Sequence, residues 1–275
     1  MKIYLPPNAV GKSIRLNKIL PDGKAVIFAF DHGVEHGPKD FPPWHMDPRA
    51  IISKVVEEGV DGIMTTKGVA IHTWDLWAGR VPLILKLTGK TSLRPKDEQL
   101  LQSPIALVED ALKLDADAVA VTVYWGSQYE DAMLRFFVEV AHIANDYGLP
   151  VLQLAYPRGP AIQNRYDVEI VRYGARAAME LGADIIKTYW TGSKETFAEV
   201  VKAATPVPVL LSGGAKKEKL EEFLEIVKAV MDAGGKGAVV GRNIFQRRDP
   251  EIALRAIKLV VHEGASVKEA MEAVK

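Results

Sequence analysis

Three lysines in this chain follow short apolar segments and could act as amine nucleophiles. Lys187 ends the segment Glu180 to Lys187, and Lys67 and Lys86 follow two earlier segments. Removing an ammonium from water costs several kcal/mol unless the group is paired or neutralised. A buried lysine beside another cation has a lowered pKa, which leaves free amine at neutral pH. Of the three lysines, Lys187 is most firmly placed at the end of a predicted strand, and it is therefore the candidate for Schiff-base chemistry.

The other two lysines fit structural roles better. Lys67 lies beyond its apolar segment, on the loop side, which favours a solvated side chain. Lys86 can point inward because side chains alternate along a strand. Asp31 also follows an apolar segment, and an ion pair between Lys86 and Asp31 is favoured over catalysis by Lys86.

Tyr156 is the candidate acid–base group. It ends an apolar segment one strand away from Lys187, and Arg158 follows it. A tyrosine between a lysine and an arginine fits proton transfer. A tyrosine that merely packs at the rim of the barrel is the alternative.

Asp31, His32 and His36 could be metal ligands. The two histidines have helix-like spacing, but two glycines and Pro38 predict a loop. No other histidine stands at the end of a predicted strand. We therefore expect no metal, and hydrogen bonds to sugar hydroxyls and phosphate are favoured for these residues.

Two glycine-containing segments indicate a phosphate site. They read Ser212-Gly213-Gly214 and Gly241-Arg242-Asn243. Glycine lets backbone N–H groups approach an anion closely, and arginine can add a bidentate contact. The loops after the last two strands of a barrel commonly bind phosphate. A phosphorylated substrate follows, with simple chain turns as the alternative.

The apolar segments that must position these groups are of two alternating kinds. One follows a helix end and a small residue, as in Glu180 to Ile186, and the other begins with proline, as in Pro150 to Leu154. Proline is tolerated at the first residue of a strand. The alternation predicts eight strands, at 26–31, 61–66, 82–87, 117–123, 150–156, 183–188, 207–212 and 237–241.

Helical periodicity separates most of these strands. Apolar positions recur at three- and four-residue spacing over 105–114, 132–147, 168–181, 195–203 and 220–233. Eight βα units predict an α/β protein with a single (β/α)8 TIM barrel. We expect the barrel to span 25–275 and an N-terminal extension, 1–24, to cap its bottom or pack on a neighbour. A doubly wound open sheet is the alternative, but it would usually show a glycine-rich fingerprint after the first strand.

Composition excludes several classes of protein. The 275 residues are 48% hydrophobic and 25% charged with no formal net charge, which gives no reason to expect nucleic acid or an anionic membrane as a partner. No apolar run reaches the roughly 18 residues that span a bilayer, and residues 1–20 lack the apolar core of a secretion signal. The absence of cysteine rules out disulfides and thiol catalysis. We therefore expect a cytoplasmic protein.

The candidate residues fall in long motifs that resemble the archaeal-type class I fructose-1,6-bisphosphate aldolases. The resemblance covers almost the whole barrel, from Asp31 to Arg248. The motifs that carry it are Phe30-Asp31-His32-Gly33-Val34-Glu35-His36-Gly37-Pro38, Pro82-Leu83-Ile84-Leu85-Lys86-Leu87-Thr88-Gly89-Lys90-Thr91, Tyr156-Pro157-Arg158-Gly159, Gly182-Ala183-Asp184-Ile185-Ile186-Lys187, Leu211-Ser212-Gly213-Gly214 and Val240-Gly241-Arg242-Asn243.

The resemblance implies a role for each matching residue. Lys187 would form the Schiff base, Tyr156 would donate a proton, and Asp31 would assist. The residues that would contact substrate are His32, His36, Asp40, Arg158, Ser212, Gly213, Gly241 and Arg242. The implied reaction cleaves fructose 1,6-bisphosphate to dihydroxyacetone phosphate and glyceraldehyde 3-phosphate, or forms it from them, without a metal or other cofactor.

Two departures from the aldolase pattern leave a sister group open. Leu154 stands where a tryptophan can precede the tyrosine, and Tyr189 stands where a second basic residue can follow the lysine. The synthases that make 2-amino-3,7-dideoxy-D-threo-hept-6-ulosonate share the aspartate, tyrosine and lysine motifs. They tend to lack the second histidine, here His36, and the pattern at 86–91, so the aldolase is favoured. A sugar-phosphate-binding barrel without catalysis is the third alternative.

The resemblance also bears on assembly. Members of the family form rings of subunits, often decamers, which implies a homo-oligomer. The N-terminal arm and three tryptophans that we expect to be exposed could supply the contacts, namely Trp44, Trp74 and Trp77.

Overall fold

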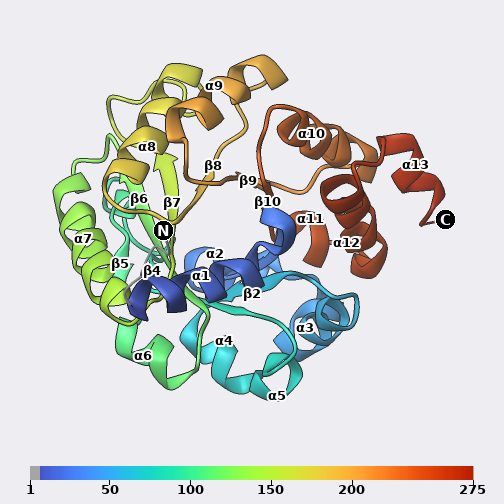
Figure 1. Cartoon of the computed structure of the whole chain (residues 1–275), viewed down its shortest axis with the longest axis horizontal. Coiled ribbons are helices and arrows are strands. Elements are labelled where there is room, and N and C mark those ends of the chain that lie inside the picture. Colours follow the sequence, from blue (N-terminus) through green and yellow to red (C-terminus); the bar gives the residue numbers. More distant parts are fainter. Residues whose placement is uncertain (1–6, 275) are drawn as a thin grey trace, which may run out of the picture.

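Eight parallel strands close into a barrel in the computed structural model, which describes residues 7–274 (Figure 1). The strand β1 pairs with both β2 and β10, and this pairing closes the sheet. The barrel strands are β1 (Ala25–Phe30), β2 (Gly62–Thr65), β3 (Leu83–Lys86), β6 (Ala118–Trp125), β7 (Val151–Pro157), β8 (Ile185–Thr188), β9 (Val209–Ser212) and β10 (Gly237–Val240). The predicted (β/α)8 barrel is confirmed, and each strand overlaps its predicted segment.

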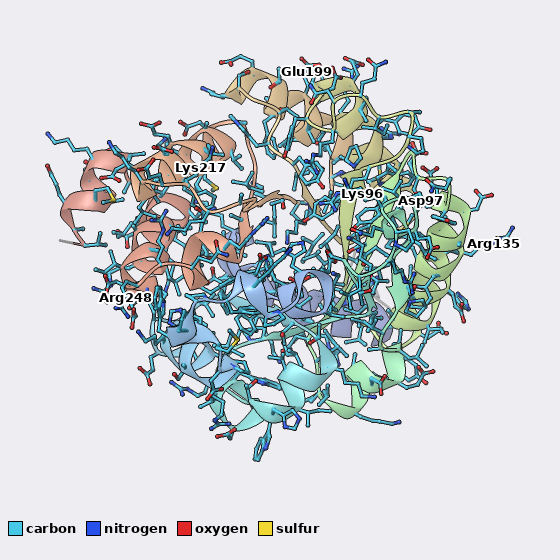
Figure 2. The ribbon with its side chains drawn as sticks, turned by 180° about the vertical axis from the view of Figure 1, so that it is seen from behind. Lys96, Asp97, Arg135, Glu199, Lys217 and Arg248 are labelled. Atoms are coloured by element: carbon cyan, nitrogen blue, oxygen red, sulfur yellow. The ribbon has the colours of Figure 1, made fainter. Side chains whose placement is uncertain are left out.

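The helices form an outer ring around the strands (Figure 1). The larger ones are α3 (Pro48–Glu57), α7 (Glu130–Asp146), α8 (Val168–Glu180), α9 (Lys194–Ala204), α10 (Leu220–Asp232) and α12 (Pro250–Lys258). They cover the outer face of a sheet whose inner face is also buried, which is why the strands are continuous apolar runs. Charged side chains such as Arg135 and Glu199 lie on the outside of this ring (Figure 2).

One helix begins later than its periodicity predicted. The pattern at 105–114 gives the helix α6 (Val108–Lys113). Its first residues belong instead to a small hairpin of β4 (Thr88–Gly89) and β5 (Ser103–Pro104), and the backbone N–H of Ile105 donates to the carbonyl of Leu87. The residues at this end therefore extend the pairing of β4 with β5, which follows β3, and do not belong to the helix.

The predicted weak unit between β2 and β3 holds two short helices. These are α4 (Lys67–His72) and α5 (Trp74–Trp77). Trp44 and Trp74 are exposed as predicted, but the prediction is wrong for Trp77, which is buried. The Trp77 indole packs inward because its Nε1 donates to the carbonyl of Ala70 at 3.3 Å.

The helix α1 (Pro7–Ile19) lies across the amino-terminal ends of the barrel strands. Lys12 Nζ is 3.1 Å from Asp184 Oδ2, and Lys18 Nζ is 3.0 Å from Asp117 Oδ1. These aspartates directly precede β8 and β6, so α1 covers the face of the barrel opposite the loops that follow the strands. Residues 1–6 of the predicted N-terminal extension lie outside the described residues.

Candidate active site

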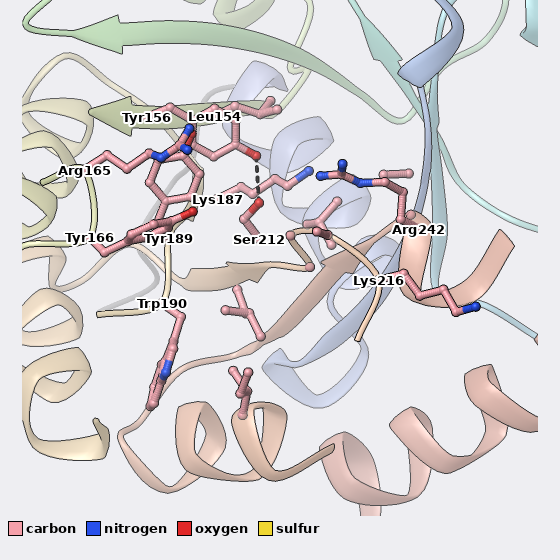
Figure 3. A pocket seen from close by; sticks show the side chains of 18 of the residues that line it. Leu154, Tyr156, Arg165, Tyr166, Lys187, Tyr189, Trp190, Ser212, Lys216 and Arg242 are labelled. Atoms are coloured by element: carbon pink, nitrogen blue, oxygen red, sulfur yellow. Dashed lines mark hydrogen bonds between the residues drawn. The ribbon is translucent and has the colours of Figure 1, made fainter. Parts of the chain in front are cut away.

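A cavity of about 940 Å³ opens where the barrel strands end (Figure 3). Its walls come from the ends of β1, β7, β8, β9 and β10 and from the loops that follow them. The predicted residues that line it are Asp31, His32, His36, Tyr156, Arg158, Lys187, Ser212, Gly213, Gly241 and Arg242. The fold thus gathers in one cavity ten of the eleven residues singled out from the sequence, all except Asp40.

Lys187 lies at the inward face of β8 and is only 6% exposed. Among residues 7–274, its amine has no hydrogen-bond or ion-pair partner. Burial lowers the pKa of Lys187 to about 8, with Asp31 raising it and Lys86 lowering it. A measurable fraction of this amine is therefore uncharged and nucleophilic at neutral pH.

Asp31 follows β1 and pairs with Lys86 at the end of β3. Lys86 Nζ donates to Asp31 Oδ2 at 3.0 Å and lies 3.7 Å from Glu35 Oε1, which confirms the predicted ion pair. Burial alone would raise the pKa of Asp31, but the charges of Lys86, His32 and Lys187 hold it below its ordinary value. Asp31 is therefore a carboxylate, and it faces two buried lysines.

Tyr156 lies at the end of β7, where its hydroxyl shares a 3.0 Å hydrogen bond with Ser212 Oγ (Figure 3). Burial raises the pKa of the Tyr156 phenol, although Ser212 and Arg158 oppose the shift. The group is therefore a protonated phenol at neutral pH. It can donate a proton inside the cavity that holds Lys187.

Arg158 follows β7 and is held by two other tyrosines. Its Nε donates to the hydroxyl of Tyr189 at 2.7 Å, and its Nη1 donates to the hydroxyl of Tyr124 at 3.2 Å. The Tyr124 hydroxyl also accepts from Gln102 Nε2 at 2.6 Å. The guanidinium is thus fixed at one side of the cavity before any ligand enters.

The loop after β9 is held by the loop after β10. Asn243 is buried, and its Nδ2 donates to the carbonyls of Gly213 and Ala215 while its Oδ1 accepts from the backbone N–H of Lys217. Gly214 adopts a φ of +66°, which favours glycine. These bonds shape the loop at 213–217 into a rigid wall of the cavity.

Gly241 and Arg242 complete this wall. A Cβ at Gly241 would lie 2.4 Å from His32 Cε1 and 2.7 Å from the carbonyl oxygen of Ala29, so only glycine fits. Arg242 begins α11 (Arg242–Phe245), and its buried Nε has no hydrogen-bond partner among the described residues. Figure 3 shows Arg242 and Lys187 directed toward one another across the cavity. The guanidinium is available to an anion placed between them.

The segment after β1 forms α2 (His32–His36), so the predicted loop is wrong there. The turn is helical through His36 and ends at Gly37, which has a φ of +75° and donates to the carbonyl of Gly33. Burial lowers the pKa of His32 to about 4, which leaves its imidazole neutral. Asp40 does not line the cavity; its Oδ2 is 2.6 Å from His36 Nδ1 and orients that ring instead.

Among residues 7–274, no group of three or more histidine, aspartate or glutamate side chains is placed to hold a metal ion. None of the helices formed by those residues is long and apolar enough to cross a membrane.

Comparison with known proteins decides the family. A sequence model of the DeoC/LacD family aldolases matches residues 25–247, which is the whole barrel up to the helix α11. The chain belongs to the DeoC/LacD aldolase family. The class 1 fructose-bisphosphate aldolase of Thermoproteus tenax is 42% identical over 249 residues, covering 90% of this chain and 93% of that protein. The class 1 enzyme of Halobacterium salinarum is 38% identical over 252 residues, covering 91% and 95%.

Solved structures agree with this assignment. One is an archaeal fructose-1,6-bisphosphate aldolase whose catalytic lysine is covalently bound to the carbinolamine intermediate of its substrate. It is 40% identical to this chain, superposes with a TM-score of 0.85, and covers 91% of this chain and 99% of that one. The resemblance to archaeal class I aldolases that the motifs predicted is confirmed.

This DeoC/LacD barrel also brings residues into the cavity that were not singled out as site residues. They are Glu35, Tyr189, Arg165, Lys216 and Lys217 among others. Glu35 reaches the cavity through the helical turn α2, which the predicted loop did not reveal. The place of Tyr189 could be predicted, because it follows Lys187 by two residues and alternation along the chain turns both side chains to the same side. Arg165 and the two lysines lie in loops whose course no periodicity reveals.

Proposed function

We propose that this protein is a class I aldolase that cleaves fructose 1,6-bisphosphate, and forms it in reverse, through a Schiff base on Lys187. The observation that carries the proposal is a buried lysine without a partner among residues 7–274, with its pKa lowered to about 8, in a cavity of about 940 Å³. Such an amine is a nucleophile at neutral pH. The relatives named above are class 1 fructose-bisphosphate aldolases that align over at least 90% of this chain.

The reaction begins at the C2 carbonyl of the open-chain sugar. Neutral Lys187 attacks this carbon and gives a carbinolamine. Tyr156, or Asp31 through a water molecule, supplies protons as the carbinolamine loses water to form the iminium. The phenol of Tyr156 is suited to this step because burial keeps it protonated.

Cleavage uses the iminium as an electron sink. A base removes the proton of the C4 hydroxyl, the C3–C4 bond breaks, and its electron pair passes to the iminium nitrogen to give an enamine. Glyceraldehyde 3-phosphate leaves, and Tyr156 returns a proton to C3. Hydrolysis of the resulting iminium then frees dihydroxyacetone phosphate and Lys187.

No metal or other cofactor takes part in this scheme. The iminium carries the positive charge that polarises the sugar carbon, which is the task a zinc ion performs in metal-dependent catalysis. Asp31 faces this charge as a carboxylate and stabilises the cation that forms on Lys187. Tyr156 and Asp31, together with water, supply the protons.

The two phosphates are assigned to opposite ends of the cavity. One binds the loops after β9 and β10, where the buried Nε of Arg242 has no partner among the described residues and Gly213 and Gly241 line the cavity. For the other end, the candidates are Arg158 and His36, which the resemblance places among the substrate contacts. Arg165 also lines the cavity. It forms no ion pair within residues 7–274, so it suits a second anion.

The sister synthase remains the second candidate, because Leu154 and Tyr189 depart from the aldolase pattern. His36 and the segment at 86–91 favour the aldolase. The test supplies fructose 1,6-bisphosphate alone and, separately, the synthase substrates, and measures release of dihydroxyacetone phosphate. Release from fructose 1,6-bisphosphate supports the proposal. Turnover of the synthase substrates alone would replace it with the synthase, and phosphate-dependent binding without turnover would indicate a binding protein.

Assembly and location stay predictions. The family resemblance favours a homo-oligomer, with a decamer as the expected form. Trp44 and Trp74 are exposed apolar side chains that could lie in subunit contacts. The balanced charge and the absence of cysteine favour the cytoplasm.

A further inference from the structure

Tyr189 directly follows β8 and lies against the predicted proton donor, Tyr156. It follows Lys187 by two residues, so its side chain faces the cavity on the same side of the barrel. The ring of Tyr189 stacks on the ring of Tyr156 with centroids 4.5 Å apart and planes 3° apart (Figure 3). Only 8% of Tyr189 is exposed. The two rings are therefore buried as a pair.

The Tyr189 ring is itself held from two further directions. Its hydroxyl accepts the 2.7 Å bond from Arg158 Nε, and the ring of Tyr166 meets its face edge-on at 5.4 Å between centroids. Arg158 in turn is anchored to Tyr124. Tyr189 is thus held by Arg158 and Tyr166 independently of Tyr156, whose hydroxyl has one hydrogen bond, to Ser212.

We propose that Tyr189 is a positioning residue for Tyr156, holding its ring so that the phenol hydroxyl meets the substrate carbon that must be protonated. The inference rests on the proposed function, because it gives Tyr156 the proton transfers of the Schiff-base reaction. A tyrosine hydroxyl moves on an arc when its ring tilts, and a parallel stacked ring with its centroid 4.5 Å away blocks the tilt on that side. A misplacement of about 1 Å at a reacting group costs about 10²-fold in rate.

If Tyr189 has this role, its replacement should affect two measurable steps to different extents. Formation of the iminium with dihydroxyacetone phosphate requires Lys187, and sodium borohydride traps it. Exchange of the C3 proton of dihydroxyacetone phosphate with deuterium from D₂O additionally requires proton transfer at that carbon, which the scheme assigns to Tyr156. Because Asp31 can supply the protons for iminium formation through a water molecule, a residue that positions Tyr156 slows the exchange much more than it lowers the trapping. A residue that only supports the fold changes both.

Tyr189→Met tests the ring, and Tyr189→Phe is its matched control. Methionine fills irregular apolar space but has no planar face, whereas phenylalanine keeps the face and loses only the hydroxyl that accepts from Arg158. For Tyr189→Met we expect a fall in exchange of about 30- to 100-fold, with trapping within about threefold of the unaltered protein. For Tyr189→Phe we expect exchange within about fivefold, since the stack remains. Tyr189→Leu replaces the methionine variant if that variant does not fold.

A double variant shows whether Tyr189 acts through Tyr156. If it does, Tyr156→Phe with Tyr189→Met exchanges no more slowly than Tyr156→Phe alone, because the positioned hydroxyl is already gone. The same fold loss in both backgrounds would overturn the inference. So would an equal fall of trapping and exchange, or unchanged exchange in Tyr189→Met. If the unaltered protein gives no borohydride adduct, the proposed function fails together with the inference. If the unaltered protein gives both the adduct and the exchange, and Tyr189→Met changes neither, the inference alone fails.

Discussion

Two buried lysines at the barrel mouth have opposite electrostatic surroundings. Lys86 ends β3 and is 1% exposed, and Lys187 lies in β8 and is 6% exposed. Lys86 donates to Asp31 and lies 3.7 Å from Glu35. Burial lowers the pKa of Lys86, but these two carboxylates outweigh it and raise the pKa above its ordinary value. Lys187 has no such partner within residues 7–274, and burial lowers its pKa to about 8.

The difference shows that partners, not burial, decide the role of a lysine in this fold. Both side chains lose water, but only Lys86 gains compensating charges at hydrogen-bond distance. Lys86 is thus a permanent cation, and its charge also lowers the pKa of Lys187. Asp31 links the two, since it pairs with the first lysine and faces the second. The charge of Lys86 therefore favours the uncharged, nucleophilic form of Lys187.

Removing Lys187 should have the largest effect. Lys187→Met abolishes the amine that forms the iminium, so we expect cleavage of fructose 1,6-bisphosphate to fall by about 10⁵-fold, as for the loss of a covalent nucleophile elsewhere. Binding of the sugar phosphate should persist, because the loops after β9 and β10 are unchanged. The checks are release of dihydroxyacetone phosphate and a titration with substrate. Retained turnover would exclude Lys187 as the nucleophile.

Removing Lys86 should act on stability as well as on activity. Lys86→Met leaves Asp31 and Glu35 without their buried cation, and breaking such a pair costs about 3–5 kcal/mol of the free energy of unfolding. Urea unfolding measures this cost. The matched control is Lys67→Met, since Lys67 pairs with Asp110 while 45% exposed, and an exposed pair contributes at most about 1 kcal/mol. Equal losses in the two variants would contradict the contrast between a buried pair and an exposed one.

The pH dependence of activity should report the lowered pKa of Lys187. The free amine is the reactive form, so kcat/KM should rise with pH and level off above about 8. Between pH 8 and pH 7 we expect about a fivefold fall, as the amine becomes protonated. In Lys86→Met the midpoint should move to higher pH, because a neighbouring cation has been removed. A midpoint that does not move would show that the charge of Lys86 does not lower the pKa of Lys187.

The sequence predicted the fold and the two lysines from local features. Apolar runs with prolines at their starts marked the strands, and Lys187 and Lys86 stood at strand ends where alternation points side chains inward. The Lys86–Asp31 pair followed, because both residues end strands on one rim. The same features did not reveal α2, because the glycines and Pro38 favoured a loop, whereas the backbone forms a helical turn closed by the bond from the Gly37 N–H to the Gly33 carbonyl.

The parts of the site that escaped prediction depend on tertiary packing. The stack of Tyr189 on Tyr156 needs the spacing of β7 and β8 and the tether from Arg158. The bonds of Asn243 to 213–217 join the helix α11 to a loop 26 to 30 residues earlier in the chain. Asp40 was assigned to substrate from its motif, but it lies behind His36 and outside the cavity lining. Sequence patterns give the strand order and the rim, while the loops above the rim depend on contacts between distant segments.

The most direct test of the difference between the two lysines is borohydride reduction with dihydroxyacetone phosphate, followed by peptide mapping. Both lysines are buried at the same rim, so the adduct site distinguishes them without any substitution. We predict a single adduct on the peptide that contains Lys187 and none on the peptide that contains Lys86. An adduct on Lys86, or no adduct while cleavage proceeds, would contradict the account.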